Sequence, residues 1–212
     1  MYAVGAAGHM LPAERPLMLH LTPAFLFFLG ALVALPSLAI DRWRFAVWMV
    51  CTYAFTFLLE AAGVATGAVF GAYRYGSTLG WAVAEVPLVI AFNWILVVNG
   101  AVCFAVRVVP PGAGTWRRPA IAGLVGVLAV AFDFIMEPVA MRLDYWQWDA
   151  GVVPMQNYAA WFVIAAAMAL CHPRHRHGNG EIGCGGNLAW FYMAVQTAFF
   201  IVLRLAWRFG MA

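Results

Sequence analysis

Asp133 and Glu137 stand four positions apart in the otherwise apolar stretch FDFIMEPVAM. A spacing of four residues places both side chains on one face of an α-helix. A charged carboxylate inside a membrane helix costs about 2.5–3.5 kcal/mol on insertion scales, so an acid in such a segment is a candidate functional group. Two close acids in an apolar setting favour each other's protonated form. We therefore expect this pair to hold a proton that can be donated in a dry site.

Two further acids lie in apolar segments. Glu60 continues a stripe of polar and small residues at helical spacing, and Glu85 stands two residues before Pro87, which can kink a helix and shape a cavity wall. We predict Asp133 or Glu137 as the proton donor, with Glu60 and Glu85 positioning water or relaying protons. The competing interpretation is structural: an Asp133–Glu137 pair neutralised by Arg142 or another arginine, a neutral hydrogen-bonded Glu60, and an ordinary helix start near Glu85.

Apolar helices must carry these acids, because 65% of the 212 residues are hydrophobic, 10% are charged and the mean hydropathy is +0.84. Soluble domains contain about 25% charged residues, so this is an integral membrane protein. A membrane-spanning helix needs about 20 apolar residues. We predict an all-α bundle of about six or seven such helices, forming one domain over residues 1–212. The expected segments are 17–40, 43–65, 81–107, 119–139, 154–171 and 187–208.

With six spans, the connections after the second and fourth segments lie on the same side of the membrane. Glu60, Glu85, Asp133 and Glu137 are all expected within about two helical turns of that side, given a rise of about 1.5 Å per residue. The connections on the opposite side hold seven of the twelve arginines. The positive-inside rule then places both termini and the acidic site outside the cytoplasm.

Several functions are excluded by composition. The sequence has no lysine, so Schiff-base chemistry and retinal attachment are excluded. The net charge of +3 is modest and the arginines flank apolar segments, which argues against a nucleic-acid partner. The His- and Cys-containing loop over 171–184 lacks the spacing of a zinc site, and we predict neither a metal nor a cofactor. The first residues do not resemble a cleaved signal peptide.

Aromatic and amide side chains near the acids are candidates for substrate binding. Aromatic faces attract cations by about 0.5–2 kcal/mol, and an amide can orient water. The segment from Asp144 to Asp149, with its two tryptophans, is either an aromatic lid at the water boundary or an interfacial anchor. The candidate substrate-binding residues are Tyr73, Tyr75, Trp81, Asn93, Trp94, Trp146, Trp148, Asn157 and Trp161.

Two blocks of sequence, GAYRYGSTLGWAVAEVPLVIAFNW and DFIMEPVAMRLDYWQWDAGVVPMQNYAAW, together resemble the bisanhydrobacterioruberin hydratase family of carotenoid hydratases. The likeness covers residues 60–161. The chain departs from the family pattern at Glu137, where members often carry Asp, and at Val153, where they often carry Gly. The resemblance implies a prokaryotic multi-pass cell-membrane enzyme that adds water across the terminal C=C of an acyclic, lycopene-like carotenoid end group.

Hydration of this alkene needs an acid that protonates the less substituted carbon, a surrounding that stabilises the tertiary cation, and a placed water. Buried carboxylic acids and aromatic faces supply the first two. The partners are then a carotenoid, water and membrane lipid, while the oligomeric state is left open. Two alternatives stay open as well. A carotenoid end-group cyclase begins with the same protonation, and intramembrane acids also serve in non-enzymatic proton-coupled or lipid-binding proteins.

Overall fold

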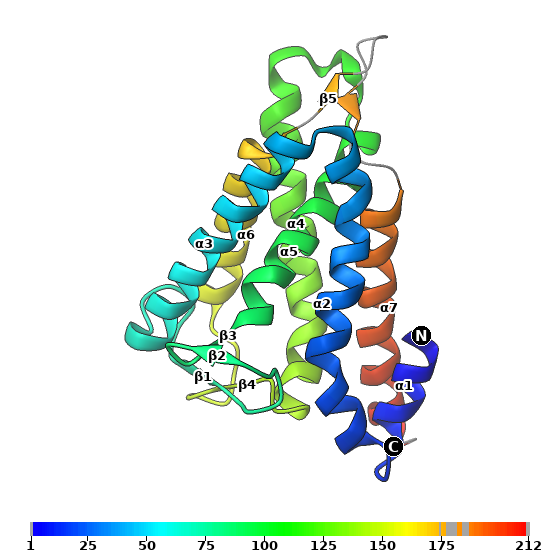
Figure 1. Cartoon of the computed structure of the whole chain (residues 1–212). Coiled ribbons are helices and arrows are strands. Elements are labelled where there is room, and N and C mark those ends of the chain that lie inside the picture. The colour runs from blue at the N-terminus through cyan, green and yellow to red at the C-terminus, as the bar shows by residue number, and fades with distance from the viewer. Residues whose placement is uncertain (1, 174, 177–181, 184–186, 211–212) are drawn as a thin grey trace.

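A bundle of helices forms most of the chain (Figure 1). The computed structural model describes residues 2–173, 175–176, 182–183 and 187–210. Within them, α2 to α5 and α7 are long and apolar enough to cross a membrane, and α6 is a shorter apolar helix of 17 residues. The predicted all-α membrane bundle is confirmed. The helices are α1 Tyr2–Met10, α2 Arg15–Ile40, α3 Arg42–Thr66, α4 Leu88–Val108, α5 Arg117–Arg142, α6 Met155–Cys171 and α7 Leu188–Arg208, with a 3-10 helix η1 at Pro111–Trp116.

The centre of the bundle is α4, which is buried on almost all sides. Its residues are nearly all apolar, as expected of a helix surrounded by other helices. Gly100 lets α7 approach closely, because a Cβ there would lie 2.8 Å from the carbonyl oxygen of Ala189. The peripheral helices α2 and α3 bury fewer residues and present apolar side chains outward, as a lipid-facing surface requires. The core therefore forms around α4.

Short strands occupy the connections between helices. Antiparallel pairs form between β1 Tyr73–Tyr75 and β4 Trp146–Trp148, between β2 Ala82–Val83 and β3 Val86–Pro87, and between β5 His175–Arg176 and β6 Ile182–Gly183. The β1–β4 pair, here called the ribbon, joins the loop after α3 to the loop after α5. Figure 1 shows it lying across the end of the bundle where α3 ends and α6 begins. The sequence predicted these two loops but not their pairing.

The third apolar segment begins as a helix seven residues later than predicted, at Leu88 instead of position 81. Residues 82–87 form the β2–β3 hairpin, whose two-residue turn is Ala84-Glu85 with φ of 49° and 64°. Two positive φ angles are typical of a type I′ hairpin turn, which normally carries Asn-Gly or a similar pair. Pro87 then precedes the first helical residue in an extended conformation. The expectation that Trp81 and Glu85 lie on this helix is therefore wrong.

Gly76 allows the two loops to meet at the end of the ribbon. Its backbone N–H donates to the carbonyl oxygen of Tyr145 at 3.0 Å, which extends the strand pairing by one bond. A Cβ at this position would collide with the backbone carbonyl oxygen and the carboxyl group of Asp144. The backbone of Asp144 cannot move away freely, because its carbonyl also accepts a hydrogen bond from Thr78 Oγ1 at 2.8 Å.

Gly76→Ala is expected to destabilise the protein by about 1–3 kcal/mol, as overpacking of a close contact does. The readout is the thermal midpoint of the detergent-solubilised protein. Gly123→Ala is the matched control, because a Cβ there would meet no atom within 4 Å. A Gly76→Ala protein as stable as the control would contradict the close approach of the two loops.

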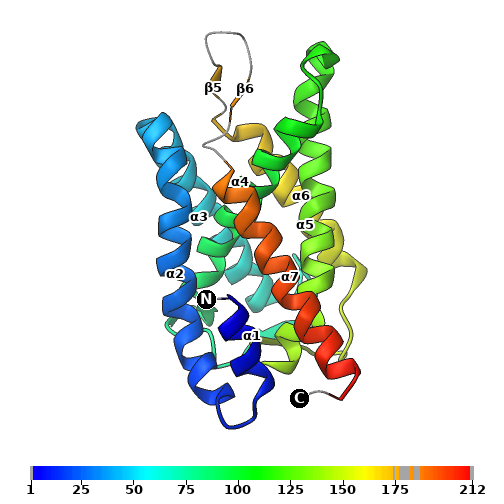
Figure 2. The same cartoon turned by 90° about the vertical axis from the view of Figure 1, so that its right-hand side faces the viewer.

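The short helix α1 had no counterpart in the sequence prediction. It packs against α2 and α7 (Figure 2), at the same end of the bundle as the ribbon (Figure 1). Ala6, Gly8 and His9 are buried at these contacts. With nine residues the helix is far too short to cross a membrane. It fills space between two spanning helices instead.

Candidate active site

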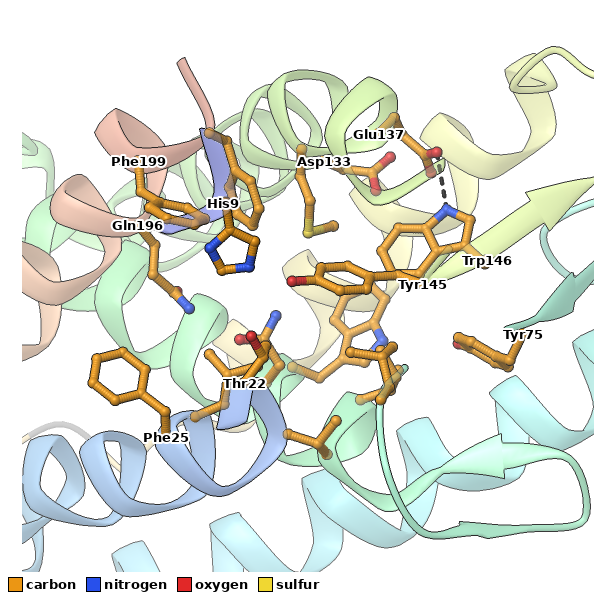
Figure 3. A pocket seen from close by; sticks show the side chains of 18 of the residues that line it. His9, Thr22, Phe25, Tyr75, Asp133, Glu137, Tyr145, Trp146, Gln196 and Phe199 are labelled. Carbon is orange, nitrogen blue, oxygen red and sulfur yellow. Dashed lines mark hydrogen bonds between the residues drawn. The ribbon is translucent and has the colours of Figure 1, made fainter. Parts of the chain in front are cut away.

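A cavity of about 370 Å³ lies inside the bundle near the ribbon. All seven α-helices and both strands of the ribbon contribute residues to its wall, which is mostly apolar. Three carboxyl groups line it, from Glu60 on α3 and from Asp133 and Glu137 on α5. In Figure 3, Glu137 and Trp146 lie on one side of the cavity, His9 and Gln196 on the other, and the ring of Tyr145 between them.

Glu60 accepts hydrogen bonds on both carboxyl oxygens. The Tyr73 and Tyr75 hydroxyls donate to Oε2 at 2.6 and 2.7 Å, and Trp94 Nε1 donates to Oε1 at 2.9 Å. The side chain is 5% exposed. Donors on both oxygens compensate a negative charge better than they compensate a neutral acid. Of the three carboxyl groups, Glu60 is the best supported as an anion.

Glu137 and Asp133 receive fewer donors. Both indole N–H groups of the ribbon, from Trp146 and Trp148, donate to Glu137 Oε2 at 3.0 and 2.9 Å. Asp133 is 0% exposed, and its Oδ2 accepts one hydrogen bond from Asn157 Nδ2 at 2.6 Å. Its Oδ1 contacts no hydrogen-bond partner among the described residues. Asp133 is therefore the carboxyl group whose negative charge is least compensated.

The alternation of side chains along a strand explains how the ribbon reaches the acids. Residues two apart on a strand point to the same face, so Tyr73 and Tyr75 both reach Glu60, and Trp146 and Trp148 both reach Glu137. The residues between them, Arg74 and Gln147, belong to the opposite face, where Arg74 pairs with Asp149 at 3.3 Å. One ribbon thus supplies four donors to two carboxyl groups.

The tyrosines of the ribbon act as donors at any physiological pH. Burial raises the pKa of Tyr73 and of Tyr75 above the ordinary tyrosine value, and the nearby Glu60 carboxyl raises both further. Burial also raises the pKa of Tyr145, which lines the cavity, to about 12. All three phenols therefore keep their protons, and Tyr73 and Tyr75 give them to Glu60 as hydrogen bonds.

Aromatic rings form much of the wall beside the acids. The Trp94 and Trp161 rings stack with centroids 4.0 Å apart, and Tyr73 packs on Trp148 at 5.1 Å. Ring faces carry negative quadrupole charge and attract a cation more strongly in a desolvated site. The cavity thus combines buried carboxyl groups with surfaces that stabilise positive charge.

A family model described as "Carotenoid biosynthesis protein" matches residues 21–210. The chain belongs to this family. It is 28% identical over 179 residues to the bisanhydrobacterioruberin hydratase of Haloarcula japonica, and the match covers 79% of the chain. The same match covers 60% of that relative, so the chain spans about three-fifths of its length. No solved structure matches the chain. The resemblance to carotenoid hydratases is confirmed at the level of the family.

In this carotenoid biosynthesis protein, the cavity brings together most of the residues predicted to form the site. Glu85 is exposed on the hairpin turn and does not line the cavity, so its predicted role in positioning water or relaying protons is not retained. Trp81 is 88% exposed and lies beside a separate surface groove. The predicted residues that do line the cavity are Glu60, Tyr73, Tyr75, Asn93, Trp94, Asp133, Glu137, Trp146, Trp148, Asn157 and Trp161.

No arginine in the described part of the chain forms an ion pair with Asp133 or Glu137. Arg142 stacks over the ring of Trp207 at 4.4 Å, and no arginine is among the described residues that line the cavity. The Asp144–Asp149 segment is neither an open lid nor an interfacial anchor, because Trp146 and Trp148 are buried in the ribbon. These contacts remove the structural alternative based on an arginine clamp.

Several polar cavity residues were not predicted from the sequence: Tyr2 and His9 on α1, Thr22 on α2, Tyr145 before β4 and Gln196 on α7. Gln196 carries a polar group in the middle of an apolar helix, which is a signal that the sequence does show. His9 precedes the first predicted segment and carries no such signal. Most of the His- and Cys-containing loop after α6 lies outside the described residues.

Proposed function

We propose that this carotenoid biosynthesis protein is an enzyme that adds water across the terminal C=C of an acyclic carotenoid end group. The observation that supports this best is the placement of three buried carboxyl groups and an aromatic wall in one apolar cavity. Alkene hydration needs this combination of a protonated acid, a surrounding that stabilises a carbocation, and room for water. The named activity of the Haloarcula japonica relative agrees with it.

Asp133 is the proposed proton donor. A negative charge on Asp133 would be compensated by a single hydrogen bond from an amide, whereas Glu60 accepts three hydrogen bonds. In a dry site Asp133 therefore holds its proton more firmly than Glu60 does. Because Asn157 occupies Oδ2, the proton resides on Oδ1, the oxygen without a partner among the described residues. Transfer of that proton to the less substituted alkene carbon leaves a tertiary cation.

The cation is stabilised by Glu60, by Glu137 and by the aromatic wall. Preorganised charges and dipoles aimed at developing charge act strongly in a site that excludes water. Glu60 is held by Tyr73, Tyr75 and Trp94, so it provides a fixed negative charge without reorganisation. The stacked indoles of Trp94 and Trp161 add cation–π attraction. No step in this scheme needs a cofactor.

The size of the cavity supports an end-group reaction. At about 370 Å³ it falls near the lower limit of pockets for small ligands, which is about 300 Å³. A carotenoid is a long polyene, so only its end and a few water molecules fit inside. The rest of the polyene extends along the apolar bundle and lipid. We expect a multi-pass protein of a prokaryotic cell membrane that takes its substrate from the bilayer.

Expression in bacteria that accumulate lycopene tests the proposal. The expected product is heavier than lycopene by one water molecule for each end that reacts. A cyclase, the nearest alternative, would give an isomer of unchanged mass, and a non-enzymatic carrier would leave lycopene unchanged. The control is the same strain with a Glu60→Gln, Asp133→Asn and Glu137→Gln triple variant at equal membrane abundance. Lycopene unchanged by the abundant wild-type protein would contradict the proposed activity for this substrate.

A further inference from the structure

The wall of the cavity opposite Glu137 carries a second polar site. His9 is 4% exposed and lines the cavity from α1, and its Nε2 has no hydrogen-bond partner among the described residues. Gln196, 3% exposed, lines the cavity from α7, and its Oε1 likewise has no partner there. Figure 3 shows both side chains on the same side of the cavity. A buried polar atom left without a partner costs about 1–3 kcal/mol, so these two point to a polar ligand.

The hydrogen bonding of His9 determines which of its nitrogens is basic. Nδ1 lies 2.7 Å from the carbonyl oxygen of Gly5, and a carbonyl can only accept, so Nδ1 carries the hydrogen. In a neutral imidazole the other nitrogen, Nε2, is then an acceptor. Burial lowers the pKa of His9, the Gly5 hydrogen bond partly opposes this, and the charge of Arg15 lowers the pKa further. His9 therefore presents a neutral, basic nitrogen to the cavity.

Two acceptors facing one space favour a ligand with two donors. Water has two hydrogens and can donate to His9 Nε2 and to Gln196 Oε1 together, which leaves its lone pairs free to attack. A tertiary alcohol has one hydrogen and satisfies one of the two. Asn93 Oδ1, which also has no partner in the described structure, adds a further acceptor, and the Tyr2 hydroxyl is a donor in the same cavity that can bond to the oxygen of the ligand. The acceptor set matches a nucleophilic water better than a hydroxylated end group.

We propose that His9 is the base that receives a proton from the attacking water, and that Gln196 positions this water. The inference rests on the proposed hydration. As the water oxygen forms the C–O bond with the tertiary cation, one of its protons passes to His9 Nε2. Return of this proton to the Asp133 carboxylate restores both groups. The sum is one alkene and one water giving one alcohol, without oxidation or reduction.

This role is not implied by family membership. The family model begins at residue 21, and α1 ends at Met10, so His9 lies outside the matched region. The acids, the ribbon and Gln196 all lie inside it. In this chain α1 completes the cavity from a segment that precedes the matched region.

Hydration measured in membranes suspended in D₂O distinguishes loss of the base from loss of the acid. Suppose that a variant still protonates the alkene but adds water to the cation only slowly. The cation then loses a proton and returns to the alkene, and the recovered carotenoid gains deuterium from the solvent. His9→Gln keeps an acceptor near the position of Nε2 but removes the base. It is expected to lower alcohol formation by about 10²-fold while deuterium still enters the recovered substrate. Asp133→Asn is expected to lose both alcohol formation and the entry of deuterium into the substrate.

His20→Gln is the matched control, because His20 is exposed and lines only the separate surface groove. Gln196→Leu tests the position of the same water from α7. The test therefore remains valid even if α1 fails to fold in the His9 variant. We expect alcohol formation to be about 10-fold slower in Gln196→Leu, while deuterium still enters the recovered substrate. Alcohol formation at the wild-type rate in both variants would overturn the inference while leaving the proposed function intact. Loss of exchange together with hydration in both variants would also overturn it. A wild-type protein that makes no alcohol would instead refute the proposed function.

Discussion

Asp133→Asn is expected to lower water addition by about 10²–10⁴-fold, the range that general acids contribute. Asn has nearly the same shape, but it has no acidic proton to give to the alkene. The hydrogen bond from Asn157 can persist, because the new side chain still has a carbonyl oxygen that can replace Oδ2. The measurement is the fraction of lycopene converted to the water-added product at equal membrane abundance of the two proteins.

Glu85→Gln provides the control, since it makes the same acid-to-amide change on the exposed hairpin turn and should leave conversion unchanged. Comparing Glu137→Gln with Asp133→Asn shows which of the two acids of α5 donates the proton. If Glu137→Gln abolished conversion and Asp133→Asn kept it, the proton donor would be Glu137. Full activity in both variants would remove α5 from the chemistry altogether.

Glu60→Gln is expected to reduce conversion by about 10²–10³-fold and to destabilise the protein as well. The amide replaces a negative charge with a neutral group, so the stabilisation of the cation is lost. An amide nitrogen also cannot accept, whereas the carboxyl group accepts from Tyr73, Tyr75 and Trp94. At least one buried donor then loses its partner, which costs about 1–3 kcal/mol.

Both effects of Glu60→Gln are measurable, as conversion of lycopene and as the thermal midpoint of the purified protein. Asp149→Asn is a suitable comparison, because Asp149 pairs with Arg74 on the exposed face of the ribbon. An exposed ion pair contributes about 0–1 kcal/mol, so neither quantity should change much. A Glu60→Gln protein with the stability and activity of the comparison variant would show that the three hydrogen bonds are dispensable.

The spanning helices and the acids could be predicted from the sequence, because long apolar runs and carboxyl groups within them are strong local signals. The start of α4 could not. Ala84 and Glu85 adopt positive φ without being glycine or asparagine, so the turn carries no residue that marks it. The apolar residues around it extend the hydrophobic run of α4, and for that reason the sequence predicts a helix where the hairpin lies.

The ribbon and α1 were missed for different reasons. The patterns Tyr-Arg-Tyr and Trp-Gln-Trp alternate as strands do, but three residues are too few to distinguish a strand from a loop. Tyr73 and Trp148, which pair in the ribbon, are 75 residues apart in the sequence, and a local sequence pattern cannot reveal a pairing over such a distance. The helix α1 is short and rich in small residues, and its stability comes from packing on α2 and α7.

The ribbon also limits how this protein can be shortened, lengthened or recombined. Each strand presents its donors at every second residue, so an insertion of one residue in either loop would turn tyrosines or tryptophans away from their acid. Two loops from different halves of the chain must therefore keep matching lengths, and chimeras that exchange only one of them should lose function. The connection through η1 has no buried residues and should accept insertions. Engineered versions of the protein should therefore keep both ribbon loops as one unit.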